Sequence, residues 1–286
     1  MSLPTIAIVT PSLNQGRYLE QTIRSVVEQD YPALRYWVQD GGSTDGSLDI
    51  IKKYEPQLAG WTSGRDEGHA DAVNRGFSRI EGEVMAFINS DDYYLPGALR
   101  AAGEAFAADP ELDMIYGDAL YVDPDDRPLV IDVLPAYDWE DLKRICIVPQ
   151  QACFWRRRAW EAAGGLGRAL WFSFDYEFFL KVAEKGKVRH VPRLMAAYRH
   201  HMQAKTSHSR GRWAEDDRKL RERYLGRPEW DFGDWLRLKW LTTRQIAAIG
   251  MRSLRGERFP TLVPARWQRV ARRRMERLIA DRGEKN

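Results

Sequence analysis

Two adjacent carboxylates follow a short apolar stretch in the first third of the chain, in the segment Asn89-Ser-Asp-Asp92. Carboxylates this close together repel each other unless a positive charge shares their site. Mg²⁺ and Mn²⁺ prefer oxygen ligands and commonly bridge one or two carboxylates to the phosphates of a substrate. The segment therefore predicts a divalent metal held by Asp91 and Asp92. The alternative is that one of the two caps a helix beginning near Pro96.

A second polar loop has the sequence Asp40-Gly-Gly-Ser-Thr-Asp45. An exposed carboxylate here can accept hydrogen bonds from a ribose or a uracil-like base, and glycines allow close backbone approach. An ordinary turn with a helix cap at Thr44 or Asp45 explains the same residues. The chain has neither GxGxxG after its first apolar run nor GxxxxGK[ST]. A dinucleotide site and a P-loop therefore lose their main support.

The elements that must position these loops alternate between strand and helix. Short apolar runs predict strands, and apolar residues at helical spacing predict the helices between them. Such alternation is typical of a parallel sheet with helices on both faces, in which ligands bind at the carboxyl ends of the strands. The loops after Val9, Gln39 and Ile88 are all such ends. The strands are predicted at 5–9, 34–39, 84–88 and 114–116, and the helices at about 18–30, 47–54 and 68–80.

The pattern loosens after about residue 121. Residues 123–128 are typical of a hairpin turn, and this part of the chain is expected to build the acceptor side of a site. A strand is predicted at 150–155, a helix at 174–185, and short strands at 187–191 and 194–198. Helices follow at about 212–225, 231–249 and 265–280.

Size and composition indicate a globular protein with one main domain and an extension, at 286 residues with 44% apolar and 30% charged content. Two cysteines, Cys146 and Cys153, are too few for a disulfide framework. The sequence shows no secretory leader pattern and no apolar run of membrane-spanning length. A cytoplasmic protein is the expectation.

Charge is divided unevenly along the chain. Residues 1–206 carry a net charge of −7 and residues 207–286 one of +10, and the second part holds five of the eleven tryptophans. Interleaved Trp and Arg on amphipathic helices suit a membrane interface. Nucleic acid or an acidic partner would also attract a basic tail. A solvated helical surface, or packing against the main domain or a second subunit, explains the tail equally well.

Four segments, read in order, resemble motifs of the family 2 glycosyltransferases, which have the GT-A fold. Val9-Thr-Pro-Ser-Leu-Asn14 resembles the family's P-x-x-N signature, and Val38-Gln-Asp-Gly-Gly-Ser-Thr-Asp45 its V-x-D-G-S-T-D loop. Arg65–Phe77 resembles the stretch D-x-G-x-x-D-A-x-N-x-G, and Asn89–Asp92 stands in place of the D-x-D metal motif. The resemblance covers about residues 4–206.

The resemblance implies an α/β fold: a GT-A, Rossmann-like, mostly parallel doubly wound sheet with a helical C-terminal extension. It implies a glycosyltransferase domain over residues 1–206 and a basic, Trp-rich extension over 207–286. By the same resemblance, Pro11, Asn14 and Asp40 lie near the nucleotide base with Asp66 and Asn74 close by, Asn89 and Ser90 bind the donor, and Asp91 and Asp92 bind the metal. Asn89 departs from the motif's Asp, which removes one negative charge.

A later segment, Trp171-Phe-Ser-Phe-Asp-Tyr-Glu177, resembles the family segment that supplies the catalytic base. The resemblance places the base at Asp175, with Glu177 as second choice. A base must lie beside the acceptor hydroxyl that it deprotonates. The alternative is a carboxylate that merely favours the start of a helix.

Tyr198–Thr206 resembles the end of the family domain, which implies that Arg199, His201 and Lys205 neutralise the leaving diphosphate and that His201 reaches the metal. A solvated surface histidine is the alternative. Trp155, Trp171 and Phe172 suit stacking on sugar faces but suit a core equally well.

The resulting hypothesis is an inverting, metal-dependent glycosyltransferase using Mn²⁺ or Mg²⁺. It would move a sugar from a nucleotide-sugar donor, by analogy a UDP-sugar, to a saccharide or lipid-linked acceptor in surface polysaccharide synthesis. Peripheral membrane contact through the tail is expected, and a nucleic-acid partner is not. The alternatives are a nucleotide-sugar-binding module and a nucleotidyltransferase, which would need a Gly-rich, basic loop where this chain has Pro11-Ser-Leu-Asn-Gln15.

Overall fold

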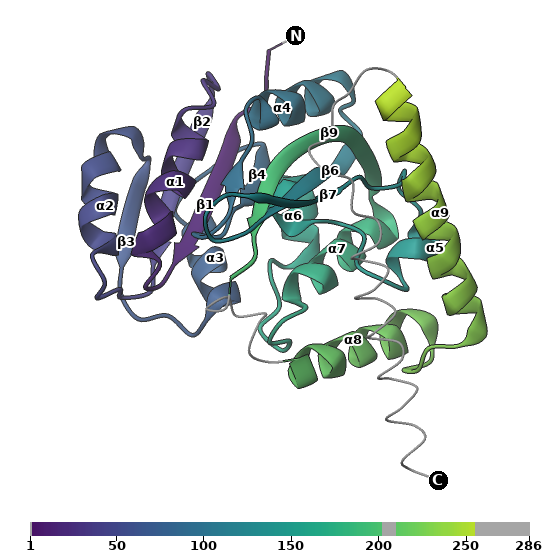
Figure 1. Ribbon diagram of the computed structural model, residues 1–286. Helices are drawn as coiled ribbons and strands as arrows, with labels where there is room; N and C mark the ends of the chain where they lie inside the picture. The colour runs from purple at the N-terminus through teal and green to yellow at the C-terminus, as the bar shows by residue number, and fades with distance from the viewer. Residues whose placement is uncertain (1, 202–209, 255–286) are drawn as a thin grey trace.

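A single nine-stranded sheet flanked by helices organises the described part of the chain, residues 2–201 and 210–254 of this computed structural model (Figure 1). Along most of the sheet the strands are ordered β3-β2-β1-β4-β8-β6-β9-β5, and β7 pairs with β6. The first four strands in the chain run parallel to one another. They are β1 (Ile6–Ser12), β2 (Leu34–Asp40), β3 (Gly60–Ser63) and β4 (Val84–Phe87).

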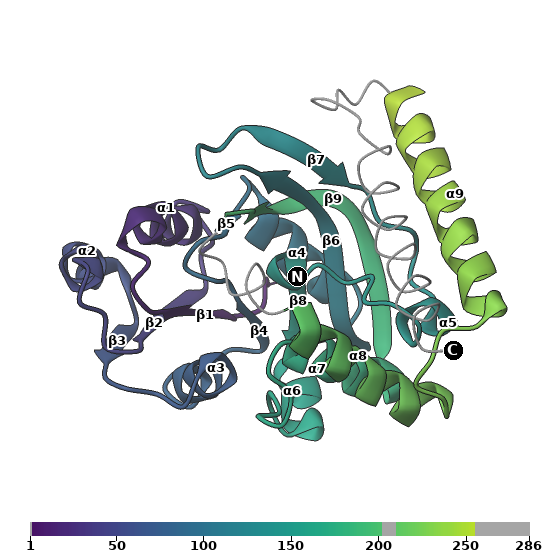
Figure 2. The same cartoon turned by 60° about the horizontal axis from the view of Figure 1, so that its bottom comes forward.

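Helices cover both faces of this parallel half (Figure 2). Alternate residues of β1 serve the two faces: Ile6 and Ile8 are buried with residues of α1, whereas Ala7 and Val9 are buried with residues of α3. Such two-sided burial is typical of parallel strands. It explains why β1 is apolar at every position from 6 to 9. The helices are α1 (Gly16–Val27), α2 (Ser47–Tyr54) and α3 (His69–Phe77).

Gly76 allows α3 to lie close to the sheet. A Cβ at this position would lie 2.5 Å from Cγ1 of Val9, a distance at which one of the two segments must move. The absence of a side chain therefore sets the spacing between α3 and β1. It also sets the place of the loop that leads into α3.

Antiparallel strands enter in the second half of the sheet. β8 lies between β4 and β6 and is antiparallel to both, while β9 runs parallel to β6. β5 and β7 add antiparallel edges to β9 and β6. The strands are β5 (Tyr93–Tyr94), β6 (Leu112–Val122), β7 (Pro128–Asp132), β8 (Cys153–Arg156) and β9 (Lys187–Arg199).

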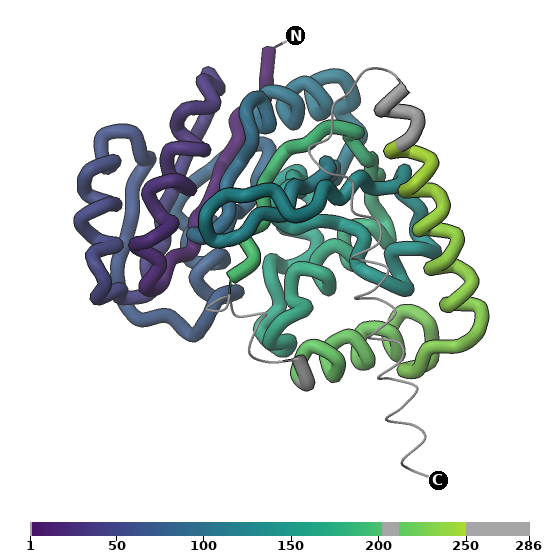
Figure 3. Tube along the Cα trace, viewed as in Figure 1, coloured from purple at the N-terminus to yellow at the C-terminus, as the bar shows by residue number. Residues whose placement is uncertain are grey.

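The remaining helices divide between the same two clusters of buried residues, one on each face of the sheet. α4 packs in the cluster that contains α1, and α6 and α7 pack in the cluster that contains α3. The β6–β7 hairpin extends from the second half of the sheet towards α1, where Arg17 lies 3.4 Å from Asp125 in the turn (Figure 3). The helices are α4 (Ala98–Ala108), α5 (Trp139–Leu142), α6 (Arg157–Ala163) and α7 (Phe174–Lys185), with short 3₁₀ turns at Glu55–Gln57 and Gln150–Ala152.

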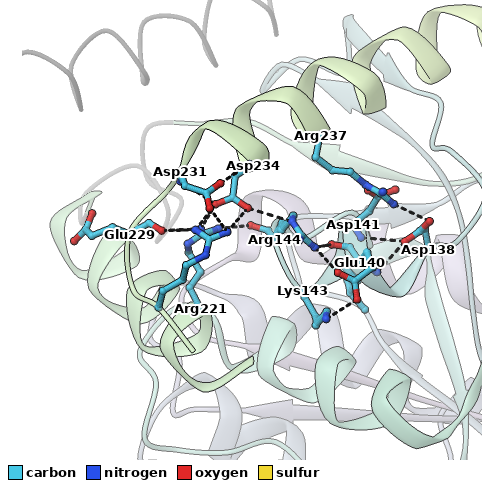
Figure 4. Close-up of polar contacts among 12 residues, drawn as sticks. Asp138, Glu140, Asp141, Lys143, Arg144, Arg221, Glu229, Asp231, Asp234 and Arg237 are labelled. Atoms are coloured by element: carbon cyan, nitrogen blue, oxygen red, sulfur yellow. Dashed lines mark hydrogen bonds and ion pairs between the residues drawn. The ribbon is translucent and has the colours of Figure 1, made fainter. Parts of the chain in front are cut away.

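The C-terminal extension packs against the body through α8 (Arg210–Leu225) and α9 (Phe232–Leu254). Leu220 and Leu241 belong to the same buried cluster as residues of α3, α6 and α7. Ion pairs add to this contact: Arg237 of α9 bonds to the buried carboxylate of Asp141 in α5 (Figure 4). Residues 210–254 therefore share the core of the preceding domain.

The predicted fold class, an α/β GT-A arrangement with a Rossmann-like parallel half and a helical extension, is confirmed. The helices at 47–54 and 174–185 match the prediction, and α8 and α9 lie close to the predicted 212–225 and 231–249. The predicted helix at 265–280 lies outside the described residues. β3, β5, α5 and α6 were not predicted, and the strand expected at 150–155 is a 3₁₀ turn followed by β8.

The two strands expected at 187–191 and 194–198 form one strand, β9. Pro192 interrupts the sequence pattern there. It lies where the pairing with β6 shifts register, between His190 and Leu194. Proline has no backbone N–H to donate to a neighbouring strand. It is tolerated at such irregularities because the regular hydrogen-bond pattern is interrupted there.

Candidate active site

Asn14 joins the loops that follow β1 and β2. It has a positive φ of 52°, a conformation that asparagine adopts more readily than most residues. Its backbone N–H donates to Ser43 Oγ at 2.8 Å, and its Oδ1 accepts from the Thr44 N–H at 2.8 Å. Pro11 lies just before it, buried within β1. The first two loops predicted to share a site therefore contact each other directly.

The carboxylate of Asp40 is fully buried and organises its own loop. Its Oδ2 accepts hydrogen bonds from the N–H groups of Gly42 and Ser43, each at 2.9 Å, and from Ser63 Oγ at 2.6 Å. Three donors on one oxygen compensate for the loss of water around a charge. Asp40 thus shapes the loop, and its contact with a nucleotide base stays a prediction.

Asp66 lies beside the same loop. A Cβ added at Gly41 would lie 2.8 Å from Asp66 Oδ2, so this side chain approaches the glycine backbone closely. The other oxygen accepts from the Gly68 N–H at 2.9 Å, which ties Asp66 to the start of α3. The structure therefore brings Asp66 beside Gly41, the residue that follows Asp40.

Asn74 is engaged with a different loop. Its Nδ2 donates to the Leu166 carbonyl at 2.9 Å, and its Oδ1 accepts from the Leu166 N–H at 3.0 Å. This two-way pairing holds the loop after α6 against α3. The structure gives Asn74 a role in packing, and its place near a donor stays a prediction.

The acidic loop follows β4 and meets the end of β9. Oδ2 of Asp91 lies 3.0 Å from Nε2 of His201, and the two side chains are 18% and 3% exposed. The His201 ring packs against Tyr18 of α1, with 4.9 Å between ring centres. Two of the three residues predicted to bind metal are thus in contact.

Asp92, the third predicted ligand, faces inward. Its Oδ1 accepts from the Arg199 N–H at 2.9 Å, and its Oδ2 accepts from Asn89 Nδ2 at 3.3 Å. Burial, together with the adjacent Asp91 carboxylate, raises the pKa of Asp92 well above its usual range. Because both oxygens bond to protein donors, Asp92 fits a metal less well than Asp91 does.

Asn89 connects the acidic loop to the 3₁₀ turn before β8. Its Nδ2 also donates to Gln150 Oε1 at 3.2 Å, and Gln150 Nε2 donates to the Phe87 carbonyl at 2.7 Å. Its Oδ1 is buried and has no hydrogen-bond partner among the described residues. Ser90 is buried beside it. The sequence placed Gln150 only in a segment expected to line the acceptor pocket, so this contact was not foreseen.

Arg199 braces the site from within the protein. Its side chain is 1% exposed, and its Nη1 lies 2.8 Å from Asp126 in the β6–β7 turn. Nη2 donates to Gln21 of α1 at 2.6 Å, and Nε donates to the Asp91 carbonyl at 3.0 Å. The guanidinium also lies 4.7 Å from the ring centre of Tyr18. These contacts favour a structural role over the predicted contact with a leaving diphosphate.

Asp91 and His201 together offer one oxygen and one nitrogen to a divalent ion. No group of three or more His, Cys, Asp or Glu side chains within residues 2–201 and 210–254 is arranged to hold a metal. An ion here would therefore need oxygen atoms from a bound phosphate or from water, as is usual for Mg²⁺. Lys205, predicted to act with Arg199 and His201, lies outside the described residues.

Asp175 lies half-buried in the first turn of α7. The preceding residue, Phe174, packs on His69 with 5.1 Å between ring centres, and His69 packs on Phe87 at 5.9 Å. Phe87 is the last residue of β4, directly before the acidic loop. This chain of contacts places the start of α7 beside the carboxyl end of β4.

Glu177, the second choice for the base, is held in ion pairs. Its oxygens lie 2.8 Å from Arg223 Nη1 and 3.3 Å from Lys181 Nζ. Its side chain is 9% exposed. Both oxygens of Glu177 are thus engaged by cations, so Asp175 remains the better candidate.

The extension contributes a residue that sequence reasoning missed. Oδ2 of Asp216, in α8, accepts hydrogen bonds from the N–H groups of Phe172 and Ser173, at 2.8 and 3.3 Å. No local pattern links Asp216 to the segment 171–177, because the contact joins residues more than 40 positions apart. Only the tertiary fold reveals it.

The aromatic candidates separate by burial. Trp155 is fully buried and packs against Phe178 at 4.8 Å, so the core alternative holds for it. Trp171 is 51% exposed, and the guanidinium of Arg212 lies 5.3 Å from its ring centre. An exposed indole four residues before Asp175 remains able to meet a sugar.

A sequence model described as glycosyl transferase family 2 matches residues 7–203. The chain belongs to this family. The match spans every loop of the candidate site and ends just after His201. Helices α8 and α9 lie beyond it.

Curated relatives within the family include polysaccharide synthases. The chondroitin synthase of Pasteurella multocida (strain Pm70) is 26% identical over 199 residues, which cover 67% of this chain and 20% of that protein. The hyaluronan synthase of Pasteurella multocida is also 26% identical, with the same shares of the two chains. The chain thus spans about a fifth of the length of these synthases.

Solved structures support the fold. The structure of S. aureus TarS residues 1–349 in complex with UDP-GlcNAc matches with a TM-score of 0.64 and 18% identity, covering 80% of this chain and 69% of that one. The fold is therefore GT-A. No helix in the described residues is long and apolar enough to cross a membrane.

Proposed function

We propose that this glycosyltransferase moves a sugar from a nucleotide-sugar donor to an acceptor hydroxyl with inversion at the anomeric carbon. The observation that carries the proposal is the meeting of three elements at the carboxyl ends of the parallel strands. These are the joined loops of Asn14 and Asp40, the Asp91–His201 pair, and the start of α7 with Asp175. Ligands of open α/β sheets bind at such an edge.

The donor is proposed to be a UDP-sugar bound between the loops of Asn14, Asp40 and Asp66. Support comes from the TarS structure, which contains UDP-GlcNAc. The mannosyltransferase PcManGT from Pyrobaculum calidifontis, solved with GDP-Man and Mn²⁺, matches with a TM-score of 0.54 and 18% identity over 95% of this chain and 80% of that one. Both UDP- and GDP-sugars therefore belong in a test.

A divalent ion, Mn²⁺ or Mg²⁺, would be held by Asp91 and His201, with the donor diphosphate and water completing its shell. The residues fit such an ion, since Asp91 Oδ2 and His201 Nε2 lie within 3.0 Å of each other. When bound, the metal would neutralise charge on the departing diphosphate. Asp92 and Arg199 would hold the Asp91 loop in place rather than bind the ion.

Asp175 is proposed to act as general base. It would accept the proton of the acceptor hydroxyl while that oxygen attacks the anomeric carbon from the face opposite the diphosphate. The bond between the anomeric carbon and the phosphate oxygen breaks, and its electron pair leaves with the nucleoside diphosphate. One displacement of this kind inverts the configuration.

The acceptor is proposed to be a saccharide or a lipid-linked saccharide in surface polysaccharide synthesis, reached at the cytoplasmic face of a membrane. Relatedness to the chondroitin and hyaluronan synthases supports the saccharide. The outer side of α9 supports a membrane contact, since Phe232, Leu236 and Trp240 recur every four residues and are 72%, 49% and 56% exposed. Residues 255–286 add 10 Lys or Arg against 4 Asp or Glu.

The test is a thermal-shift and hydrolysis screen of UDP-N-acetylglucosamine, UDP-glucose, UDP-galactose, UDP-glucuronic acid and GDP-mannose, each with and without Mn²⁺. A bound donor raises the melting temperature by mass action. We expect a metal-dependent shift with one donor that is lost in Asp91→Ala and kept in Glu104→Gln, a control at an exposed carboxylate of α4.

Three results would point to other functions. Binding without hydrolysis or transfer would favour a nucleotide-sugar-binding module. Formation of a nucleotide sugar from a nucleoside triphosphate and a sugar phosphate would favour a nucleotidyltransferase. Salt-sensitive binding of nucleic acid would contradict the absence of such a partner.

A further inference from the structure

The backbone that leads into the helix carrying Asp175 is held by another helix. Ser173 occupies the N-cap position of α7 but makes no side-chain cap bond, and its hydroxyl has no hydrogen-bond partner among the described residues. The N–H groups of Phe172 and Ser173 instead donate to Oδ2 of Asp216. Asp216 belongs to α8, in the extension. A serine at an N-cap ordinarily accepts from the N–H groups two or three residues further along, whereas Asp216 holds the N–H groups of the N-cap residue and of the residue before it.

Burial of Asp216 indicates that its contact is specific. The residue is 4% exposed, and a carboxylate without water is unfavourable unless donors surround it. Two backbone N–H groups at the positive end of a helix provide such donors. Moving either helix by more than about 1 Å would break bonds of 2.8 and 3.3 Å and leave the charge uncompensated.

A second contact joins the same two helices on the far side of Asp175. Arg223 of α8 lies 2.8 Å from Glu177, one turn into α7. Asp216 therefore holds the backbone just before Asp175, and Arg223 holds a side chain just after it. The proposed base, Asp175, therefore lies between the two places where α8 contacts this segment.

α8 is itself fixed to the body by a buried ion cluster. Arg221 is 2% exposed and lies 2.5 Å from Asp234 of α9, and its Nη1 donates to the carbonyl of Arg144 at 3.1 Å (Figure 4). Arg144 also contacts Asp234, at 3.1 Å. α8 is thus held by contacts that do not involve α7.

We infer that Asp216 is a positioning residue for the general base, so that the C-terminal extension is part of the catalytic apparatus. This rests on the proposed role of Asp175. Asp216 fixes the backbone directly before α7, and Oδ1 of Asp175 accepts from the Tyr176 N–H at 2.8 Å, so the position of this backbone sets the direction of the Asp175 carboxylate. A displacement of about 1 Å in a reacting group can lower turnover about 100-fold.

The test compares Asp216→Ala with Glu215→Ala, a control at the adjacent residue, which is exposed and forms an ion pair with Lys219 of the same helix at 2.8 Å. Hydrogen–deuterium exchange of the peptide containing residues 170–176 reports the hydrogen bonds from Phe172 and Ser173 to Asp216. Release of UDP from UDP-N-acetylglucosamine with water as acceptor, or from the donor that the screen selects, reports turnover. Titration with UDP reports the donor site.

In Asp216→Ala we expect exchange of this peptide to accelerate about 5- to 150-fold, as the loss of hydrogen bonds to a buried carboxylate gives. Turnover should fall about 10- to 100-fold while the Kd for UDP stays within about twofold. Asp216→Asn keeps an acceptor oxygen and should restore turnover to within about threefold of wild type. Should Asp216→Ala fail to fold, Asp216→Ser carries the same comparison with a smaller side chain.

Unchanged exchange, or faster exchange with wild-type turnover, would overturn the inference. So would a parallel loss of UDP affinity, because that indicates general disruption. Failure of the proposed function gives a different result: Asp175→Asn would then turn over normally. If Asp175→Asn is inactive while Asp216→Ala keeps wild-type turnover, only the role of Asp216 is rejected.

Discussion

Oδ2 of Asp91 lies 3.0 Å from Nε2 of His201, although 110 positions separate the two residues in the chain. One follows β4 in the parallel half of the sheet, and the other follows β9 in the mixed half. A hard oxygen and an imidazole nitrogen at this separation can share one divalent ion. The pair links the two halves of the sheet at the proposed donor site.

Replacing His201 should weaken metal use with little effect on the fold. We expect His201→Ala to raise the Mn²⁺ concentration for half-maximal activity by about 10- to 100-fold, as losses at metal sites typically do. His200→Ala is the matched control, because the adjacent ring is exposed. The measurement is donor hydrolysis against Mn²⁺ concentration. Equal Mn²⁺ requirements in the two variants would remove His201 from the metal site.

Asp175→Asn should abolish most transfer while sparing donor binding. Loss of a general base lowers turnover by about 10²- to 10⁴-fold. Glu184→Gln, in the exposed last turn of the same helix, should behave as wild type. Single-turnover transfer and the Kd for UDP separate the two effects. If Glu177→Gln, and not Asp175→Asn, proves inactive, the base has been assigned to the wrong carboxylate.

Arg199→Lys should destabilise the protein despite keeping the charge. Lysine lacks the planar fork that meets Asp126, Gln21 and the Asp91 carbonyl together. Losing hydrogen bonds of a buried charged side chain typically costs about 1.5–3 kcal/mol of unfolding free energy. Chemical denaturation measures the loss, with the exposed Arg193→Lys on the same strand as control. A Lys variant as stable as the control would contradict the bracing role.

Stability should fall in acid through Asp234. Burial opposes its charge, but hydrogen bonds from Arg227, the Asp231 N–H and Arg221 prevail and lower its pKa to about 2. Because the folded pKa lies below the unfolded value of about 3.9, this stabilisation is present above pH 4 and is lost as the pH falls towards 2. The difference corresponds to about 2–3 kcal/mol.

Denaturation curves at pH 7 and pH 3 measure this effect. Asp234→Asn should lose stability at pH 7 and show a smaller further loss in acid than wild type. The matched control is Asp231→Asn, since Asp231 is exposed at the edge of the same cluster. An identical acid response in wild type and Asp234→Asn would show that other carboxylates dominate.

Membrane contact through α9 predicts binding to anionic vesicles. Leu236→Ser together with Trp240→Ser should reduce co-sedimentation with phosphatidylglycerol-containing vesicles, because apolar area on the exposed face is lost. Phosphatidylcholine vesicles should bind less protein than anionic ones. Thr243→Ser, at another exposed position of α9, is the control. Equal binding of the double variant and the control would remove this face from the proposal.

Local sequence patterns predicted the parallel half of the fold well. The run Ile6–Val9 reads as a strand because both of its faces are buried, and the loops after it follow from the ends of the strands. The acidic loop could be singled out from charge alone. The contact of His201 with this loop came only from the family resemblance, since no local pattern connects them.

Other features depend on tertiary contacts that no short segment encodes. Arg199 was expected to meet a substrate, yet its acceptors come from α1, the β6–β7 turn and the acidic loop. Asp216 looks like any polar residue of an amphipathic helix until α8 is placed against α7. In the sequence, a carboxylate that is solvated cannot be told from one that is buried and bound to a distant backbone N–H, as Asp216 is.

The separation of Asp91 from His201 also bears on how the protein is made. At synthesis rates of about 5–20 residues per second, the acidic loop leaves the ribosome about 5–20 s before its histidine. Asp216, which holds the backbone directly before α7, follows later still. The nascent parallel half can pack its helices in that interval, but its site stays open at one side. On the proposed assignment of Asp175 and Asp216, the active site is complete only after α8 has been synthesised.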